Sequence, residues 1–191
     1  MLLFVYNAPM NPISLFCKSR EFKEQLELLR PRLYRLAFSW TQDHAMSDDL
    51  TQEALVKALK NSRQLRDSKK LDSWTFGILH NCYRDSFRKQ KPLDNIDDFD
   101  FADEHQPDTD YEHNSITLAV RKAVHSLPGN QREIVTLVDL ESFSYADVAQ
   151  ILDIPIGTVM SRLCRARKAL THKLLHYSDK MEKTVALRRI K

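Results

Sequence analysis

Basic side chains gather in one stretch near the C-terminal end of this chain. From Ile156 to Leu175 there are five basic residues and no acidic ones, namely Arg162, Arg165, Arg167, Lys168 and Lys173. A helix with this charge pattern can enter the major groove of duplex DNA, because its cations neutralise phosphates and its polar side chains reach base edges. The same composition also occurs on the exposed face of an ordinary helix, so this stretch alone leaves both interpretations open.

Aromatic and basic side chains alternate in a second stretch, LDSWTFGILHNCYRDSFRK, which begins at Leu71. The residues with the relevant chemistry are Trp74, Phe76, Asn81, Tyr83, Arg84, Phe87 and Arg88. This combination suits single-stranded nucleic acid, because each base can stack on a ring, worth about 1–3 kcal/mol, while cations follow the backbone. The alternative is that the aromatic rings are core and the charges are solvated, which applies above all to Trp74 and Phe87.

Two carboxylates share one side of a third predicted helix. Asp49 and Glu53 are four residues apart, with Gln52 beside them. The helix is predicted to begin near Ser47, which can cap it, so that Asp49 lies in the first turn where the helix dipole favours negative charge. A docking patch for a basic partner is one interpretation. On the residues alone, a solvated acidic start to a helix is favoured.

Acidic residues dominate the segment from Pro92 to Asn114, which has nine of them and no Lys or Arg. His105 and His113 lie among these carboxylates and invite a metal-site or hydrolase hypothesis. The segment lacks helical periodicity, however, and a metal needs ligands held in a fixed geometry. We therefore expect a flexible acidic linker and a domain boundary, with no metal site, no cofactor and no catalytic residues.

The basic stretch belongs to a predicted helix-turn-helix from Ser144 to Lys168. Ser144 with Asp147 three residues on is typical of a helix N-terminus. The turn falls at Asp153–Pro155, because a residue before proline is pushed away from helical angles. Apolar residues at helical spacing predict the buried side of the second helix, namely Ile156, Val159, Leu163, Ala166 and Leu170. The opposite face then carries Thr158, Ser161, Arg162 and Arg165.

Helical periodicity extends over the rest of the chain. A helix is predicted over Glu21–Thr41 with a kink or a break at Pro31, and the helix near Ser47 has Leu50, Ala54, Leu55, Ala58 and Leu59 on its buried side. Two more helices are predicted, one with Ile116 to Leu127 and one over Gln131–Leu140. The fold class is therefore all-α. The predicted units are a loose arm (1–18), a helical domain (19–91), the linker (92–114), a second helical domain (115–176) and a basic tail (177–191) that is frayed or partner-dependent.

Composition limits the remaining possibilities. The 191 residues are 42% hydrophobic, which suffices for packed cores, and the three glycines argue against Gly-rich phosphate loops. Three widely separated cysteines favour a reducing cytoplasm over a disulfide framework. The apolar N-terminus is too short to span a bilayer, so no membrane insertion is expected, and Met10 is an alternative start.

Two blocks of the chain resemble the bacterial extracytoplasmic-function (ECF) sigma factors of the sigma-70 family. The first block, DDLTQE from Asp48, followed by Trp74 and then Asn81, is similar to region 2 of that family. The second block is similar to region 4. It comprises LP and QRE from Leu127, SYADVA from Ser144, and GTVMSRL with RAR from Gly157. The resemblance covers about residues 22–91 and 116–175.

The resemblance implies a role for each site. Asp49, Gln52 and Glu53 would dock on the clamp helices of the β′ subunit of core RNA polymerase. The −10 promoter element would be bound and melted by the second stretch, through Trp74, Phe76, Asn81, Tyr83, Arg84 and Arg88. Thr158, Ser161, Arg162 and Arg165 would read the −35 element, while Arg167 and Lys168 would hold phosphates or the β flap. The linker would thread the RNA exit channel. The family's usual partner is an anti-sigma factor.

Three positions depart from the family pattern: Met160 replaces a frequent lysine, Asp153 stands where the turn often has glycine, and Thr75 replaces a usual leucine. Two further functions were weighed. One is a stand-alone helix-turn-helix regulator whose N-terminal half binds a ligand or dimerises. The other is an enzyme using His105 and His113 on a nucleic acid.

Overall fold

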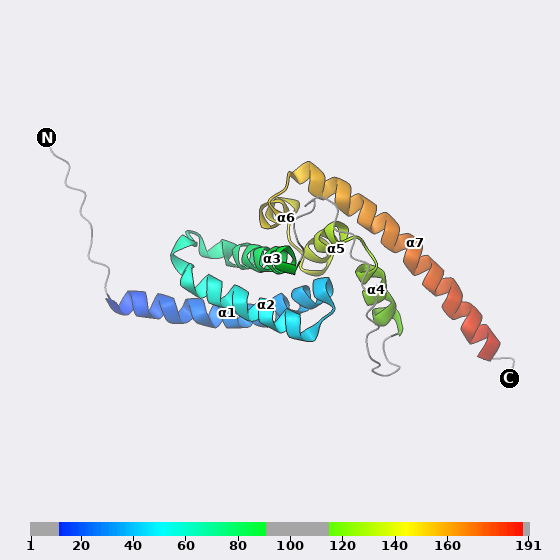
Figure 1. Cartoon of the computed structure of the whole chain (residues 1–191), viewed down its shortest axis with the longest axis horizontal. Coiled ribbons are helices and arrows are strands. Elements are labelled where there is room, and N and C mark those ends of the chain that lie inside the picture. Colours follow the sequence, from blue (N-terminus) through cyan, green and yellow to red (C-terminus); the bar gives the residue numbers. More distant parts are fainter. Residues whose placement is uncertain (1–11, 91–114, 189–191) are drawn as a thin grey trace.

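The computed structural model describes the backbone of residues 12–90 and 115–188, and the side chains of residues 20–88 and 117–175. Every regular element in these ranges is helical, which confirms the all-α prediction. An N-terminal unit holds α1 (Pro12–Thr41), α2 (His44–Lys60) and α3 (Leu71–Gln90), with two short 3₁₀ turns before α3 (Figure 1). A C-terminal unit holds α4 (Ser115–His125), α5 (Gly129–Val135), the π-helical turn η3 (Thr136–Leu140), α6 (Tyr145–Leu152) and α7 (Ile156–Arg188).

The N-terminal unit is an α1–α2 hairpin that packs against α3. Leucines at helical spacing and Trp40 bury one side of α1 completely. The predicted break at Pro31 is wrong, since α1 continues through it. The leucines before and after the proline bury against the same neighbours, and this packing offsets the lost backbone hydrogen bond.

The cap of α2 also differs from the prediction. Asp43 is the capping residue, and its carboxylate accepts from the Met46 amide at 3.0 Å. Ser47 is buried one turn inside the helix, where its hydroxyl donates to the Asp43 carbonyl. Both residue types can cap a helix, and the Thr41–Asp43 turn places Asp43 first in the chain.

The helix-turn-helix is present as predicted. The Ser144 hydroxyl caps α6 by accepting from the Asp147 amide at 3.1 Å, and Asp153 ends it in the left-handed conformation at φ 53°. A residue with φ near +53° lets the chain turn sharply into α7. α7 runs to Arg188, so the backbone stays helical where a frayed end was predicted. Residues 1–11 of the predicted arm and 91–114, with the acidic linker, lie outside the described residues.

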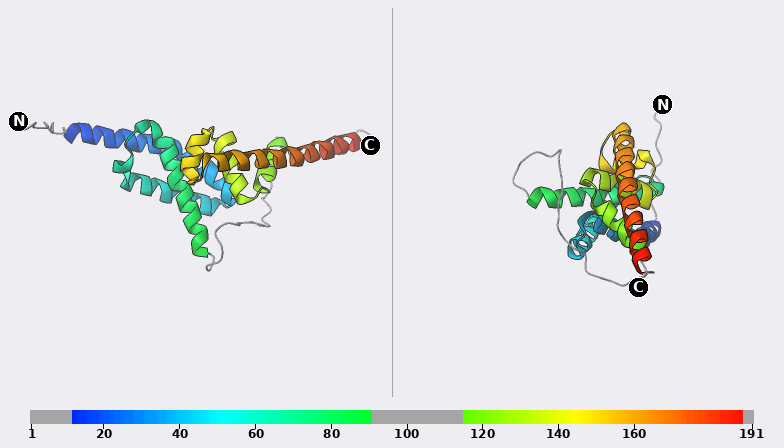
Figure 2. Two further views of the ribbon diagram at one scale, coloured as in Figure 1. Left: turned by 90° about the horizontal axis from the view of Figure 1, so that it is seen from above. Right: turned by 90° about the vertical axis from the view of Figure 1, so that its right-hand side faces the viewer.

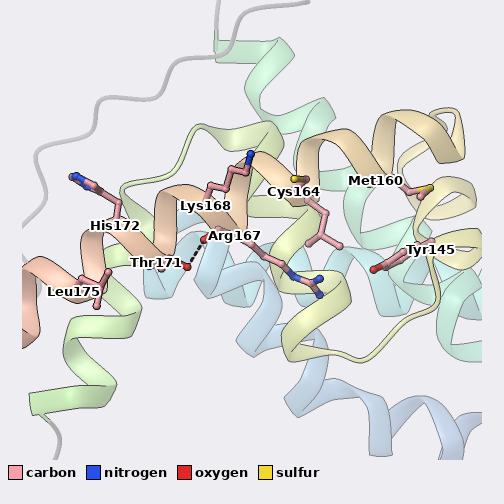
Figure 3. A pocket seen from close by; sticks show the side chains of 9 residues that line it. Tyr145, Met160, Cys164, Arg167, Lys168, Thr171, His172 and Leu175 are labelled. Atoms are coloured by element: carbon pink, nitrogen blue, oxygen red, sulfur yellow. Dashed lines mark hydrogen bonds between the residues drawn. The ribbon is translucent and has the colours of Figure 1, made fainter.

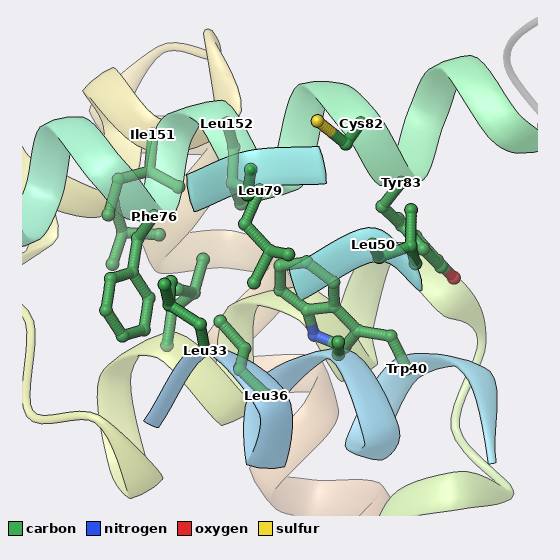
Figure 4. Close-up of a cluster of buried hydrophobic side chains, with 14 of the residues drawn as sticks. Leu33, Leu36, Trp40, Leu50, Phe76, Leu79, Cys82, Tyr83, Ile151 and Leu152 are labelled. Atoms are coloured by element: carbon green, nitrogen blue, oxygen red, sulfur yellow. The ribbon is translucent and has the colours of Figure 1, made fainter. Parts of the chain in front are cut away.

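The two units pack against each other. α6 lies across α3, and one hydrophobic cluster includes Leu36 and Trp40 of α1, Phe76 and Leu79 of α3, and Ile151 and Leu152 of α6 (Figure 4). α7 projects away from this centre as a long rod (Figure 2). Among the described helices, none is long and apolar enough to cross a membrane.

Candidate nucleic-acid interface

One face of α7 is free to meet duplex DNA. Val159, Leu163 and Ala166 are buried against the rest of the C-terminal unit, as predicted. Ser161 and Arg165 lie on the solvent side, and the Arg165 Nε donates to the Ser161 carbonyl at 3.3 Å. Thr158 and Arg162 are half-buried beside them. The structure therefore brings the four residues expected to read bases onto one side of one helix.

Arg167 lies on a different face of α7 and has a partner. Its guanidinium bonds both carboxylate oxygens of Asp139, through Nη2 at 2.5 Å and Nε at 3.2 Å. The hydrogen bond to Asp139 raises the pKa of Arg167. Lys168 is exposed next to it. In this arrangement, Lys168 is open to a phosphate, whereas Arg167 would first have to leave Asp139.

Met160 points into a groove on α7 with a volume of about 610 Å³ (Figure 3). Its side chain is 54% exposed, and the groove continues along the helix past Cys164 to Leu175. Residues 160, 164, 167, 171 and 175 follow helical spacing, so this groove is beside the DNA face and not part of it. The departure at Met160 therefore alters the groove more than the surface expected to contact bases.

The aromatic and basic residues of α3 separate into an exposed and a buried group. Asn81, Arg84 and Arg88 are exposed along one helical face, and Arg88 pairs with Asp85 at 3.0 Å. Trp74 is half-buried, with its ring centroid 6.5 Å from that of Phe22. The exposed polar row is therefore available to a DNA strand, whereas Trp74 is held against α1.

Phe76 and Tyr83 are buried. The Phe76 ring meets the Phe143 ring edge-on at 4.9 Å, and the Tyr83 ring contacts Trp40 and Phe87 at 5.0 and 4.8 Å. Burial raises the pKa of Tyr83. In this arrangement neither ring can stack on a base, because both faces are occupied by protein. Their predicted contact with DNA requires a different arrangement of the two units.

The acidic patch on α2 is exposed. Asp49, Gln52 and Glu53 all face solvent, and Glu53 forms an ion pair with Lys57 at 2.8 Å. Two apolar residues that the sequence analysis did not assign to this surface adjoin the patch. Val56 is 47% exposed, and Leu59, which was predicted to be buried, is 41% exposed. The buried stripe of α2 is already complete with Leu50, Ala54, Leu55 and Ala58, which leaves Leu59 outside the core.

A polar network between the two units was missed entirely by the sequence analysis. Arg132 of α5 donates to the Trp40 carbonyl at 2.7 Å, and the Trp40 indole donates to the Thr136 hydroxyl at 2.9 Å. Burial lowers the pKa of Arg132. Arg132 and Trp40 each belong to a motif or a hydrophobic stripe in the sequence, but no local pattern pairs residues 92 positions apart.

No group of three or more His, Cys, Asp or Glu side chains that could hold a metal occurs in the described parts of the chain. His105 and His113, the candidates for a metal or hydrolase site, lie outside them.

Comparisons with known proteins match both units. Residues 26–92 match the family described as Sigma-70 region 2, and residues 117–170 match Sigma-70, region 4. The ECF RNA polymerase sigma factor EcfG of Rhodopseudomonas palustris is 33% identical over 141 residues, which cover 74% of this chain and 78% of that protein. The ECF RNA polymerase sigma factor SigM of Mycobacterium tuberculosis is 33% identical over 152 residues, covering 76% and 72%.

A solved structure shares the arrangement of helices. It contains the sigma factor RpoE in complex with the anti-sigma factor NepR from Bartonella quintana. The sigma factor is 29% identical to this chain, with a TM-score of 0.66, and the alignment covers 81% of this chain and 97% of that one.

Proposed function

Because the chain belongs to the ECF RNA polymerase sigma factors, we propose that it brings core RNA polymerase to a set of promoters and helps to melt the DNA there. The observation that carries the proposal is the division of labour within one chain. A solvent-facing helix suited to duplex DNA, α7, and a helix with an exposed row of Asn81, Arg84 and Arg88, α3, belong to different units. Opening a promoter requires both contacts at once.

The proposed contacts follow the exposed surfaces. Asp49, Gln52 and Glu53 bind the β′ clamp helices, and Val56 and Leu59 add apolar area beside them. The exposed face of α7 reads the −35 element, with Lys168 on a phosphate or on the β flap. Asn81, Arg84 and Arg88 contact the −10 element, and Trp74, Phe76 and Tyr83 complete that site when they are accessible. None of these residues has a catalytic role.

Two further aspects rest on the relatives. The solved neighbour is in complex with an anti-sigma factor. We infer an anti-sigma partner for this chain as well, acting in the cytoplasm, where core polymerase is found. The stand-alone regulator is not favoured, because the region 2 match occupies the N-terminal half that a ligand-binding or dimerisation module would need.

A transcription assay with purified core polymerase tests the proposal. The full chain should direct run-off transcripts from ECF-type promoters, and Glu53→Lys should reduce core binding at least tenfold, because the carboxylate becomes a cation facing a basic partner. Glu27→Lys is the matched control, since Glu27 is an equally exposed carboxylate on α1, away from the patch. Absence of transcripts across a panel of such promoters would refute the function. Equal core binding by both variants would refute the docking site.

A further inference from the structure

Gly77 marks the place where the two units approach most closely. It lies in α3, and a Cβ atom built on it would be 4.0 Å from the Ile151 Cα of α6, with no other atom of a neighbouring element as close. Gly77 precedes Asn81 by four residues, so it lies on the same helical face, one turn earlier. α6 therefore covers the beginning of the face that continues as Asn81, Arg84 and Arg88.

Polar contacts hold the units in this position. Arg32 of α1 bonds Glu141, which follows η3, at 2.8 Å, and also Asp72 of its own unit at 2.5 Å. The guanidinium lies over the Phe76 and Phe143 rings, 5.2 and 6.0 Å from their centroids. Burial acts to lower the pKa of Arg32, but the hydrogen bonds to the two carboxylates outweigh it and raise the pKa.

A second set of contacts lies deeper in the interface. The Trp40 indole and carbonyl bond Thr136 and Arg132, and the His80 Nε2 is 3.5 Å from a Glu133 carboxylate oxygen. A dry, purely apolar interface would resemble the core of a single domain. This one combines apolar contacts with ion pairs and hydrogen bonds, as interfaces that open and close do.

The covered surface and the free surfaces differ in the function assigned to them. Phe76 and Tyr83, two of the rings assigned to the −10 element, are 0% and 3% exposed. Phe76 is covered by Phe143, and Tyr83 lies near enough to Glu133 and Arg132 of α5 for their charges to act on its pKa. By contrast, the Asp49–Gln52–Glu53 patch and the outer face of α7 are open to solvent.

We propose that this packing is an autoinhibited state, in which the C-terminal unit occupies the surface of α3 and α1 that unpaired DNA needs. The inference rests on the proposed function. Docking on core polymerase through α2 is possible in the closed state, whereas strand capture by Phe76 and Tyr83 requires α6 and η3 to move away. The apparent affinity of the free chain for single-stranded DNA is then reduced by the fraction of molecules that are open.

A wedge at Gly77 tests the proposal. In Gly77→Leu the side-chain carbons beyond Cβ would overlap the α6 main chain, so the closed state should be lost. The opened N-terminal unit should tolerate the leucine, because the only close neighbour of that Cβ belongs to α6. Gly77→Ala is the matched control, since its Cβ is at ordinary contact distance and closure should persist.

Two measurements read the result. Small-angle scattering of the full chain should show a compact particle for the wild type and Gly77→Ala, and a larger radius of gyration for Gly77→Leu. Fluorescence anisotropy with a labelled, mixed-sequence single-stranded DNA should show several-fold tighter binding by Gly77→Leu alone. Stacking on aromatic rings tolerates any sequence, so no promoter has to be known.

Glu141→Gln is a second variant in case the wedge disturbs folding, which circular dichroism would reveal. It removes the charge that Arg32 binds across the interface and should shift both readouts in the same direction by a smaller amount. A wild-type chain as extended as Gly77→Leu would overturn the proposal, as would an opened variant whose DNA affinity is unchanged. If the variants open and bind strand but no variant supports transcription with core polymerase, the proposed function fails and the closure stands.

Discussion

Single residues decide how firmly the two units are joined. Thr136 is buried, and its hydroxyl has two kinds of bond. It donates to the carbonyls of Arg132 and Glu133, and it accepts from the Trp40 indole. An indole N–H that loses its acceptor in the protein interior has no water to replace it, and such an unsatisfied group costs about 1–3 kcal/mol.

We therefore expect Thr136→Val to lower the free energy of unfolding by about 1–3 kcal/mol, measured by urea denaturation. Thr75→Val is the matched control. Thr75 is also fully buried and donates to the carbonyl four residues earlier at 2.7 Å, without accepting from another side chain in the structure. Its cost should be below about 1 kcal/mol, since only a helix back-bond is removed. Equal losses in the two variants would show that the indole contact contributes nothing.

Arg165 supports a prediction about DNA sequence recognition. Its side chain is exposed on the outer face of α7 and is free of carboxylate partners within the described residues. Arg165→Ala should relax discrimination at one position of the −35 element by about 1–3 kcal/mol. Competition binding of the holoenzyme to promoters with single −35 changes measures it.

The control is Arg167→Ala, which removes a cation already bound to Asp139 and should leave the discrimination unchanged. If Arg165→Ala weakens all sequences equally and flattens the salt dependence, Arg165 contacts a phosphate instead.

At the scale of elements, the geometry of the helix-turn-helix depends on one left-handed residue. Asp153 has φ 53° and ψ 50°, and its amide donates back to the Ala149 carbonyl. The left-handed region is strained for residues with a Cβ, although aspartate tolerates it better than most. The turn between α6 and α7 is therefore formed at some cost in stability.

Asp153→Gly should raise the free energy of unfolding by about 0.5–1 kcal/mol, because glycine adopts this conformation without strain. Gln150→Gly, three residues earlier on the exposed side of α6, should lower it by about 1 kcal/mol, because that position is helical. Thermal unfolding of both variants checks the opposite signs. A destabilising Asp153→Gly would mean that the aspartate side chain supports the turn in another way.

At the scale of the whole molecule, the described residues form one core from two family units. The buried cluster runs from Leu26 in α1 to Ala166 in α7 without a gap. Arg132, Trp40 and Thr136 connect the units by hydrogen bonds inside this cluster. A chain with a shared core should unfold as one cooperative body.

Urea unfolding followed by tryptophan fluorescence, which reports Trp40 and Trp74 in the N-terminal unit, should therefore coincide with unfolding followed by far-ultraviolet circular dichroism. In Gly77→Leu the two transitions should separate, since each unit then unfolds by itself. Separate transitions in the wild type would show that the shared core adds little stability.

Much of the fold and of the candidate sites could be predicted from local sequence patterns. Helical spacing of apolar residues located the helix-turn-helix and the buried face of α7, and charge segregation located the exposed rows of α3 and α2. These properties depend on residues three or four positions apart, which the chain itself brings together. The predictions at Pro31, Ser47 and Leu59 were wrong because tertiary packing outweighed the local preference.

The sequence by itself therefore determined the fold class, the family and the surfaces that could bind DNA and polymerase. Only the tertiary structure decided that Phe76 and Tyr83 are covered, that Gly77 admits α6, and that Arg32 joins the two units. Those facts depend on side chains about 70 to 110 positions apart fitting each other in shape and charge. No periodicity within either unit contains that information, because each unit folds its own helices with or without the other.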